Sequence, residues 1–140
     1  MYLPDMRGLM KSIEVVAAII ERDGLVFATQ RGYGDFKSWW EFPGGKIEGE
    51  ETSEEALVRE IHEELDTEIS VDSPVMDVSY DYDDFHLDMH CFRCSLAGKE
   101  PTLLEHEAAK WVDAHTIGLL KWLPADTEVV VALKERGIVR

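Results

Sequence analysis

The sequence predicts an α/β fold in which β-strands alternate with two α-helices. Short, β-branched segments such as residues 13–20 have the composition of strands. Residues 52–65 carry apolar side chains at helical spacing, and residues 126–136 form a second helical segment. The chain has 140 residues and 45% hydrophobic content, and no linker or repeat divides it. We therefore expect one domain spanning residues 1–140.

The first two strands are expected to form a hairpin. Residues 13–20 and 25–30 are largely apolar, and Asp23 and Gly24 between them are typical of a tight hairpin turn. Beyond this hairpin we expect a glycine-rich loop and a short apolar segment, and then residues 43–45, whose proline and two glycines should end any regular structure.

The first helix has a clear start. Thr52 is expected to cap its N-terminus, and Glu55 three residues later completes a capping box. One face of this helix is apolar and should face the core. That face comprises Leu57, Val58, Ile61 and Leu65.

The second half of the chain alternates strands with turns and ends in a helix. Gly137 follows the C-terminal helix at the position where glycine commonly ends helices. The expected elements are strands at residues 69–71, 75–82, 86–96 and 110–112, a turn at residues 83–84, and a helix at residues 126–136.

The cysteines and the N-terminal residues bear on the cellular compartment. Cys91 and Cys94 form a CxxC within a predicted strand, where positions three apart point to opposite faces, so the thiols should neither pair nor share a metal. Two free thiols fit a reduced compartment. Residues 1–11 lack the apolar run of a signal peptide and could be a flexible extension. A cytoplasmic protein with no membrane segment is expected.

The net charge of −15 limits the partners of the protein. Binding to the phosphate backbone of a nucleic-acid polymer needs many Lys and Arg residues, so such a polymer is not expected as a partner. A small phosphate ligand remains compatible with this charge, because divalent ions on clustered carboxylates invert the local field.

Three carboxylates lie on one face of the first helix. Glu60, Glu63 and Glu64 have i, i+3, i+4 spacing, and like charges at this spacing repel unless solvent or cations lie between them. Oxygen ligands of this kind suit Mg²⁺, with Mn²⁺ as a possible substitute. A solvated acidic surface is the alternative. Gly44 and Gly45 before the helix favour the metal site, because they allow the chain to pass close to a ligand.

The same region resembles the Nudix box, G-x5-E-x7-R-E-U-x-E-E-x-G-U, where U is apolar. Asp66 and Thr67 depart from the pattern, standing where the box has glycine and an apolar residue. Aspartate tolerates the left-handed conformation, so the turn can still form. The matching positions are Gly45, Glu51, Arg59, Glu60, Ile61, Glu63 and Glu64.

The likeness to MutT-like Nudix hydrolases extends over nearly the whole chain. The supporting segments are residues 41–46, 80–82, 85–86, 105–106 and 123–126. The resemblance implies a mixed β-sheet sandwiched between two α-helices. It also implies Mg²⁺-dependent hydrolysis of a nucleoside triphosphate to the monophosphate and pyrophosphate, by water attack on the β-phosphorus.

The resemblance also assigns roles to residues. It makes Glu60, Glu64 and the Gly45 carbonyl metal ligands, with Glu63 beside them as a further ligand or catalytic group. Glu105 is similar to the family's second-site carboxylate, a metal ligand or general base, and Glu107 is an alternative. Arg59 would orient the glutamates, in a structural or a catalytic role.

Five further residues are expected to contact the substrate. Arg31 and Lys46 are candidate phosphate contacts or simply solvated charges, and Tyr82 and Phe85 either stack on the base or pack in the core. Asp126 is either a helix N-cap or the residue that recognises the base edge. Ionised aspartate only accepts hydrogen bonds, so it would favour amino groups and reject a bare carbonyl unless protonated.

The expected partner is therefore a small nucleotide, such as 8-oxo-dGTP or (d)CTP. Another nucleoside-diphosphate-X substrate and a non-catalytic nucleotide-sensing module are the alternatives. A monomer and a homodimer are both compatible with the sequence.

Overall fold

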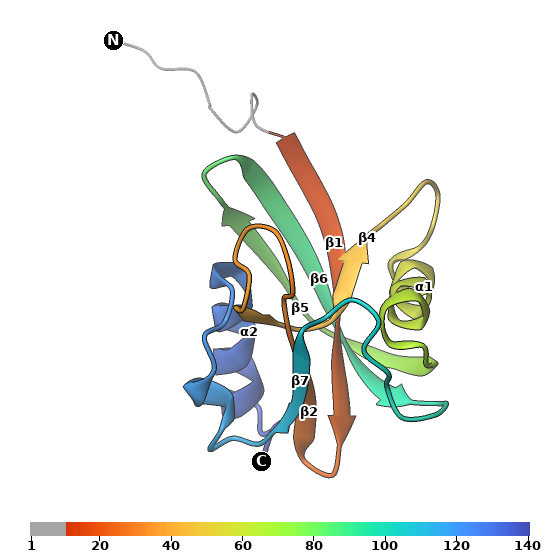
Figure 1. Cartoon of the computed structure of the whole chain (residues 1–140), viewed down its shortest axis with the longest axis vertical. Helices are drawn as coiled ribbons and strands as arrows, with labels where there is room; N and C mark the ends of the chain where they lie inside the picture. Colours follow the sequence, from red (N-terminus) through yellow and green to blue (C-terminus); the bar gives the residue numbers. More distant parts are fainter. Residues whose placement is uncertain (1–10) are drawn as a thin grey trace.

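The computed structural model describes residues 11–140, in which a mixed sheet lies between two helices (Figure 1). Part of the expected N-terminal extension, residues 1–10, lies outside the described residues, whereas Lys11 already belongs to the first strand. The elements are β1 (Lys11–Arg22), β2 (Leu25–Gln30), β3 (Trp40–Glu41), β4 (Gly44–Lys46), α1 (Ser53–Leu65), β5 (Ile69–Asp81), β6 (Phe85–Leu96), β7 (Ala108–Val112), a 3₁₀ turn (Ile117–Leu119) and α2 (Pro124–Glu135).

Strand β1 organises the sheet. It runs parallel to β6 over ten residue pairs on one edge, and its other edge is shared between β4 and β2. The path of strands is β3-β2-β1-β6-β5, with β7 added to β2. Among the strand pairs of residues 11–140, only β1 and β6 run parallel, apart from a single parallel bridge between Trp40 and Trp122. The expected mixed sheet is thus confirmed.

The helices cover opposite faces of this sheet, as Figure 1 shows. Side chains of β1 alternate between the two cores: Val16, Ala18 and Ile20 pack with α1, whereas Ala17 and Ile19 pack with α2. All five are at most 2% exposed. Burial on both faces explains why this strand is almost continuously apolar.

The predicted hairpin and the cysteine geometry are confirmed. Glu21 pairs with Val26, and Asp23 and Gly24 both adopt positive φ angles in the turn. Cys91 and Cys94 are free and buried in different cores, one on each face of the sheet.

Several expected boundaries were wrong. The strands expected at residues 69–71 and 75–82 are one strand, β5, which ends at Asp81 and whose two bulges take up the irregular residues around Pro74. Residues 44–46 form β4 where the glycines were expected to end regular structure. Helix α2 begins at Pro124 instead of Asp126, because proline suits the first helical position.

The described residues contain no helix long and apolar enough to cross a membrane.

Gly44 is required by the close approach of β4 to β1. A Cβ atom at this position would overlap the Val16 carbonyl oxygen and lie 2.9 Å from the Ala17 Cα. We predict that Gly44→Ala lowers the free energy of unfolding by about 3 kcal/mol. Urea denaturation measures this.

Gly118→Ala is the matched control. Gly118 is exposed and has open space around its Cβ direction, so the change should stay within about 0.5 kcal/mol. Equal stability of the two variants would contradict the prediction.

Candidate active site

The N-terminal cap of helix α1 fixes the residue at which the helix begins. The Glu55 N–H donates to the Thr52 Oγ1 at 3.1 Å, and the Glu55 carboxylate accepts the Thr52 N–H at 2.9 Å. Leu57, Ile61 and Leu65 are fully buried. The predicted capping box and apolar face are confirmed, and together they determine where the carboxylates of the helix lie.

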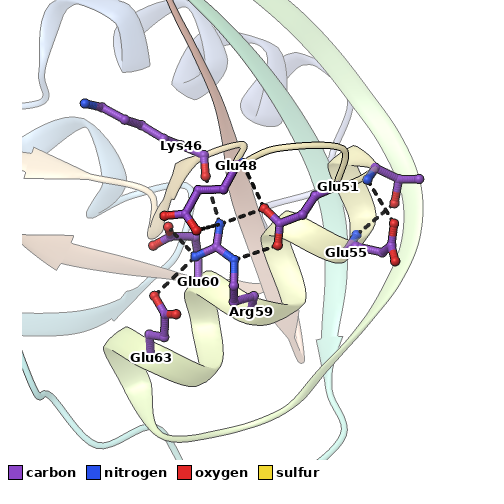
Figure 2. A network of polar contacts seen from close by, with 8 residues as sticks. Lys46, Glu48, Glu51, Glu55, Arg59, Glu60 and Glu63 are labelled. Carbon is purple, nitrogen blue, oxygen red and sulfur yellow. Dashed lines mark hydrogen bonds and ion pairs between the residues drawn. The ribbon is translucent and has the colours of Figure 1, made fainter.

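Arg59 holds the carboxylates together (Figure 2). Its guanidinium donates to both oxygens of Glu51, at 2.6 and 2.9 Å, and to Glu60 at 2.9 Å and Glu63 at 3.2 Å. It also donates to the Lys46 carbonyl at 3.0 Å, which ties α1 to β4. These charge-assisted bonds raise the pKa of Arg59 further above its usual value. Arg59 therefore orients two of the three candidate ligands.

Gly45 lies directly against the carboxylate of Glu60. A Cβ atom at position 45 would lie 2.7 Å from Glu60 Oε1 and closer still to the rest of that carboxylate. Any side chain here would displace Glu60. The need for glycine thus comes from the carboxylate as well as from a ligand.

The side chain of Glu64 is more buried than is usual for an ionised carboxylate. It is partly buried, and its Oε2 is enclosed without a hydrogen-bond partner among residues 11–140. Burial, followed by the charges of Glu60, Glu105 and Glu41, raises its pKa to about 9. Glu60 is also partly buried with a raised pKa, and of the three glutamates only Glu63 is exposed.

Glu105 approaches this group from the loop before β7. The Leu104 N–H donates to the Glu64 carbonyl at 3.1 Å, which places the Glu105 backbone next to α1. Glu107 lies farther along, where its carboxylate accepts from the Ser38 hydroxyl at 3.2 Å. Glu105 lines the cavity described below, whereas Glu107 does not, so the geometry favours Glu105.

This group fits a divalent metal ion. An enclosed carboxylate oxygen without a partner is what a cation would complete, and carboxylate and carbonyl oxygens are the donors that Mg²⁺ prefers. Within residues 11–140, no three acidic, His or Cys side chains converge tightly enough to form a metal cage.

A cavity of about 590 Å³ extends from Glu64 to α2. Part of its wall is apolar and comes from β1 and β6, including Val15, Ala17, Leu87 and Met89. Eight of the predicted site residues line it, while Arg59, Glu60 and Glu63 lie beside it. The eight are Arg31, Gly45, Lys46, Glu64, Tyr82, Phe85, Glu105 and Asp126.

Tyr82 and Phe85 form an aromatic wall at the α2 end. Their rings stack with centroids 4.9 Å apart, and Phe36 contacts Tyr82 edge-on at 5.6 Å. The Tyr82 hydroxyl accepts from the Ala125 N–H at 3.1 Å. The pair therefore packs against neighbouring residues and also presents surface to the cavity.

Asp126 lies at the α2 end of the cavity and is only 4% exposed. The alternative role as N-cap is wrong, because Leu123 occupies that position and Asp126 lies three residues into the helix. Its Oδ2 instead accepts from the Phe42 N–H at 2.9 Å. Burial raises the pKa of Asp126 to about 8.

The two predicted phosphate contacts differ in their surroundings. Lys46 is exposed at the cavity, whereas Arg31 forms a two-point ion pair with Glu41, at 2.8 and 3.3 Å.

Glu41 and His106 also line the cavity, and neither was assigned a role from the sequence. Both lie in the segments that resemble MutT-like proteins, which was the available signal. The His106 Nδ1 is enclosed and unpartnered within the described chain.

Comparison with known proteins gives consistent matches. Residues 10–133 match the family described as NUDIX domain. The chain is 36% identical over 124 residues to the CTP pyrophosphohydrolase of Escherichia coli (strain K12), covering 88% of this chain and 92% of the relative. It is 30% identical over 123 residues to an 8-oxo-dGTP diphosphatase of Haemophilus influenzae, covering 86% and 90%. The solved structure of the E. coli ORF135 protein superposes with a TM-score of 0.79 and 34% identity, covering 91% of this chain and 92% of that one.

The partial burial of Glu64 and its raised pKa predict that this residue lowers the stability of the metal-free protein at high pH. The pKa of Glu64 in the folded protein lies above its ordinary value of 4.5. Below about pH 4.5 the carboxyl is protonated in the folded and the unfolded chain, so its burial does not lower the free energy of unfolding through ionisation. As the pH rises toward 9, only the unfolded chain ionises freely, and the metal-free fold loses stability. We predict that Glu64→Gln stabilises the protein in chelator at pH 8 by about 1 kcal/mol or more.

Thermal unfolding in chelator at pH 5.5 and pH 8 tests this, with the exposed Glu63→Gln as control. The gain should shrink at the lower pH. Added Mg²⁺ should stabilise the wild type more than Glu64→Gln. A Glu64→Gln variant less stable than the wild type at pH 8 without metal would contradict the argument.

Proposed function

The chain belongs to the NUDIX domain family, and we propose that it hydrolyses a (deoxy)nucleoside triphosphate to the monophosphate and pyrophosphate. Nudix hydrolases generally need a divalent metal ion and act on small nucleotides. One observation carries the proposal: Glu64, whose Oε2 has no partner within residues 11–140, lines a nucleotide-sized cavity that also reaches Asp126. The names of two relatives, CTP pyrophosphohydrolase and 8-oxo-dGTP diphosphatase, favour a cytosine or oxidised nucleotide.

The residues around Glu64 supply the metal site of this proposal. Glu60, Glu64 and the Gly45 carbonyl would hold Mg²⁺, or Mn²⁺ in its place, with Glu63 beside them. Such an ion neutralises phosphate charge and lowers the pKa of the attacking water. Arg59 donates hydrogen bonds to Glu60 and Glu63 and does not line the cavity, which supports a positioning role in this proposal.

The bond that breaks joins the β-phosphorus to the oxygen bridging it to the α-phosphorus. Water adds to the β-phosphorus and the bridging oxygen leaves with the monophosphate. Glu105, whose charge acts on Glu64 and whose neighbour Leu104 is bonded to the Glu64 carbonyl, would accept the proton of that water. Lys46, exposed at the cavity, can contact the phosphates, while Arg31 is engaged by Glu41.

The reduced, buried thiols fit a cytoplasmic enzyme that acts on the nucleotide pool.

Removal of a metal-ligand charge should abolish turnover without unfolding the protein. We predict that Glu60→Gln and Glu64→Gln each lower kcat by about 100-fold or more, because transition-state charge loses its stabilisation. Glu54→Gln, an exposed glutamate in the first turn of the same helix, should keep kcat within about twofold.

Product analysis by chromatography gives the measurement. Monophosphate and pyrophosphate from a triphosphate support the proposed reaction. Absence of wild-type turnover with Mg²⁺ or Mn²⁺ across a nucleotide panel would favour a non-catalytic module, and cleavage only of dinucleoside polyphosphates or nucleotide sugars would favour the nucleoside-diphosphate-X alternative. Near-normal turnover in both variants would refute the assigned ligands.

Asp126 is the proposed determinant of base preference. With its pKa at about 8 it carries a proton at neutral pH, so it can donate as well as accept, as asparagine does. The sequence left the protonation state of Asp126 open, and the raised pKa favours the protonated form. Because two relatives are named for CTP and 8-oxo-dGTP, we predict faster hydrolysis of dCTP and 8-oxo-dGTP than of dTTP, with the same preference in Asp126→Asn below pH 8.

Above pH 8 the wild-type carboxyl ionises and only accepts, so its preference should diverge from that of Asp126→Asn. Asp126→Leu should lose about tenfold in kcat/KM for the favoured nucleotides, because their base edge is left unpaired. Values of kcat/KM for the three nucleotides at pH 6.5 and pH 9 test this role of Asp126 in base preference. The prediction fails if dTTP is the fastest substrate.

A further inference from the structure

The loop that carries Glu105 is bonded to the C-terminal end of α1. The last carbonyls of a helix lack intrahelical partners, and here the loop supplies them. The Thr102 N–H donates to the Leu65 carbonyl at 2.7 Å, and the Leu104 N–H donates to the Glu64 carbonyl at 3.1 Å. The second bond joins the Glu64 backbone to the residue before Glu105. This loop therefore sets the separation of two proposed catalytic carboxylates.

The start of this loop is held by a backbone hydrogen bond, in which the Ala97 N–H donates to the Glu68 carbonyl at 2.9 Å, and by the two residues that depart from the Nudix box. Thr67 is 3% exposed, and its hydroxyl donates a short hydrogen bond to the Lys99 carbonyl. Asp66, in the left-handed conformation at φ 50°, accepts from the Lys99 ammonium at 2.6 Å. Glycine and an apolar side chain, the residues of the box at these positions, could make neither contact.

The two contacts differ in how much they contribute to holding the loop. Both members of the Asp66–Lys99 pair have exposed side chains, 46% and 60%, and exposed pairs contribute little. The Thr67 hydroxyl is buried and would lose its partner altogether if the loop moved. Thr67 is therefore the stronger anchor.

The position of Glu105 depends on these anchors because its side chain is exposed and lacks the packing that would otherwise fix it. Downstream, the Glu107 N–H donates to the Gln30 carbonyl at 2.9 Å, which holds the loop to β2. Glu105 thus lies between one anchor on β2 and one on α1. Loss of the α1 anchor would move Glu105 relative to Glu64 while leaving the α2 end of the cavity intact.

We propose that Thr67 is a positioning residue for hydrolysis: through the Lys99 carbonyl it holds the 97–105 loop on α1 and so fixes Glu105 opposite Glu64. The proposal rests on the function proposed above. Thr67 touches neither substrate nor reacting atoms and acts through Glu105.

The test compares Thr67→Val, which keeps the shape and removes the hydroxyl, with Thr67→Ser, which keeps the hydroxyl. Thr67→Val should lower kcat about tenfold with KM within twofold, and Thr67→Ser should stay within twofold in both. In a Glu105→Gln background, Thr67→Val should cause no further loss, because residues that act through one group are non-additive. Lys99→Met, which leaves the carbonyl in place, should keep kcat within twofold.

A second measurement needs neither metal nor substrate. Amide hydrogen exchange of the metal-free protein should speed up at least tenfold at Thr102 and Leu104 in Thr67→Val, and stay near the wild-type rate in Thr67→Ser. If Thr67→Val does not fold, Thr67→Cys, with its weak donor, should fall below Thr67→Ser in kcat and exchange faster at the same amides.

Three outcomes would overturn the proposal: an equal loss of kcat from Thr67→Val with and without Glu105, unchanged kcat in Thr67→Val, or unchanged exchange at Thr102 and Leu104. Wild-type protein without turnover would refute the proposed function as well. Normal wild-type turnover without coupling between Thr67 and Glu105 would refute this inference alone.

Discussion

The crowding of negative charge around one arginine is the constraint on which the site depends. Arg59 is bonded to three carboxylates, yet burial, followed by the charges of neighbouring glutamates, still raises the pKa of Glu60 and Glu64. The protein keeps this uncompensated charge partly out of water, at a cost in stability. Such an arrangement is understandable where a cation and a polyphosphate complete the site. The close approach of Gly45 to Glu60 follows from the same crowding.

The fold supplies the two ends of the site from its two cores. Helix α1, with one core behind it, carries the carboxylates, while α2, seated on the other core, carries Asp126. Strand β1 contributes alternate side chains to both cores and also forms part of the cavity wall between them. A single central strand thus runs between the proposed phosphate end and the proposed base end of the cavity.

The sequence predicted local features well and long-range ones less well. The capping box of Thr52, the apolar stripe of α1 and the opposed cysteines follow from spacing along one element, and all are confirmed. The burial of Glu64 was missed because it depends on Glu105, about forty residues away, and on the loop that carries it. Strand β4 was missed because its glycines look like a break unless the carbonyl of Val16 is known to lie against them. Residues of the candidate site were named from the sequence. The ion pair between Arg31 and Glu41 was not predicted.

The two cysteines on opposite faces of β6 have a consequence for chemical durability. Burial raises the pKa of Cys94 to about 12 and that of Cys91 further, so both thiols stay protonated at physiological pH. Peroxides attack the thiolate, and neither sulfur offers one or lies at the surface. If the enzyme removes oxidised nucleotides, it works when peroxide is abundant. Its two thiols are then protected by the same two cores that lie on either side of the sheet.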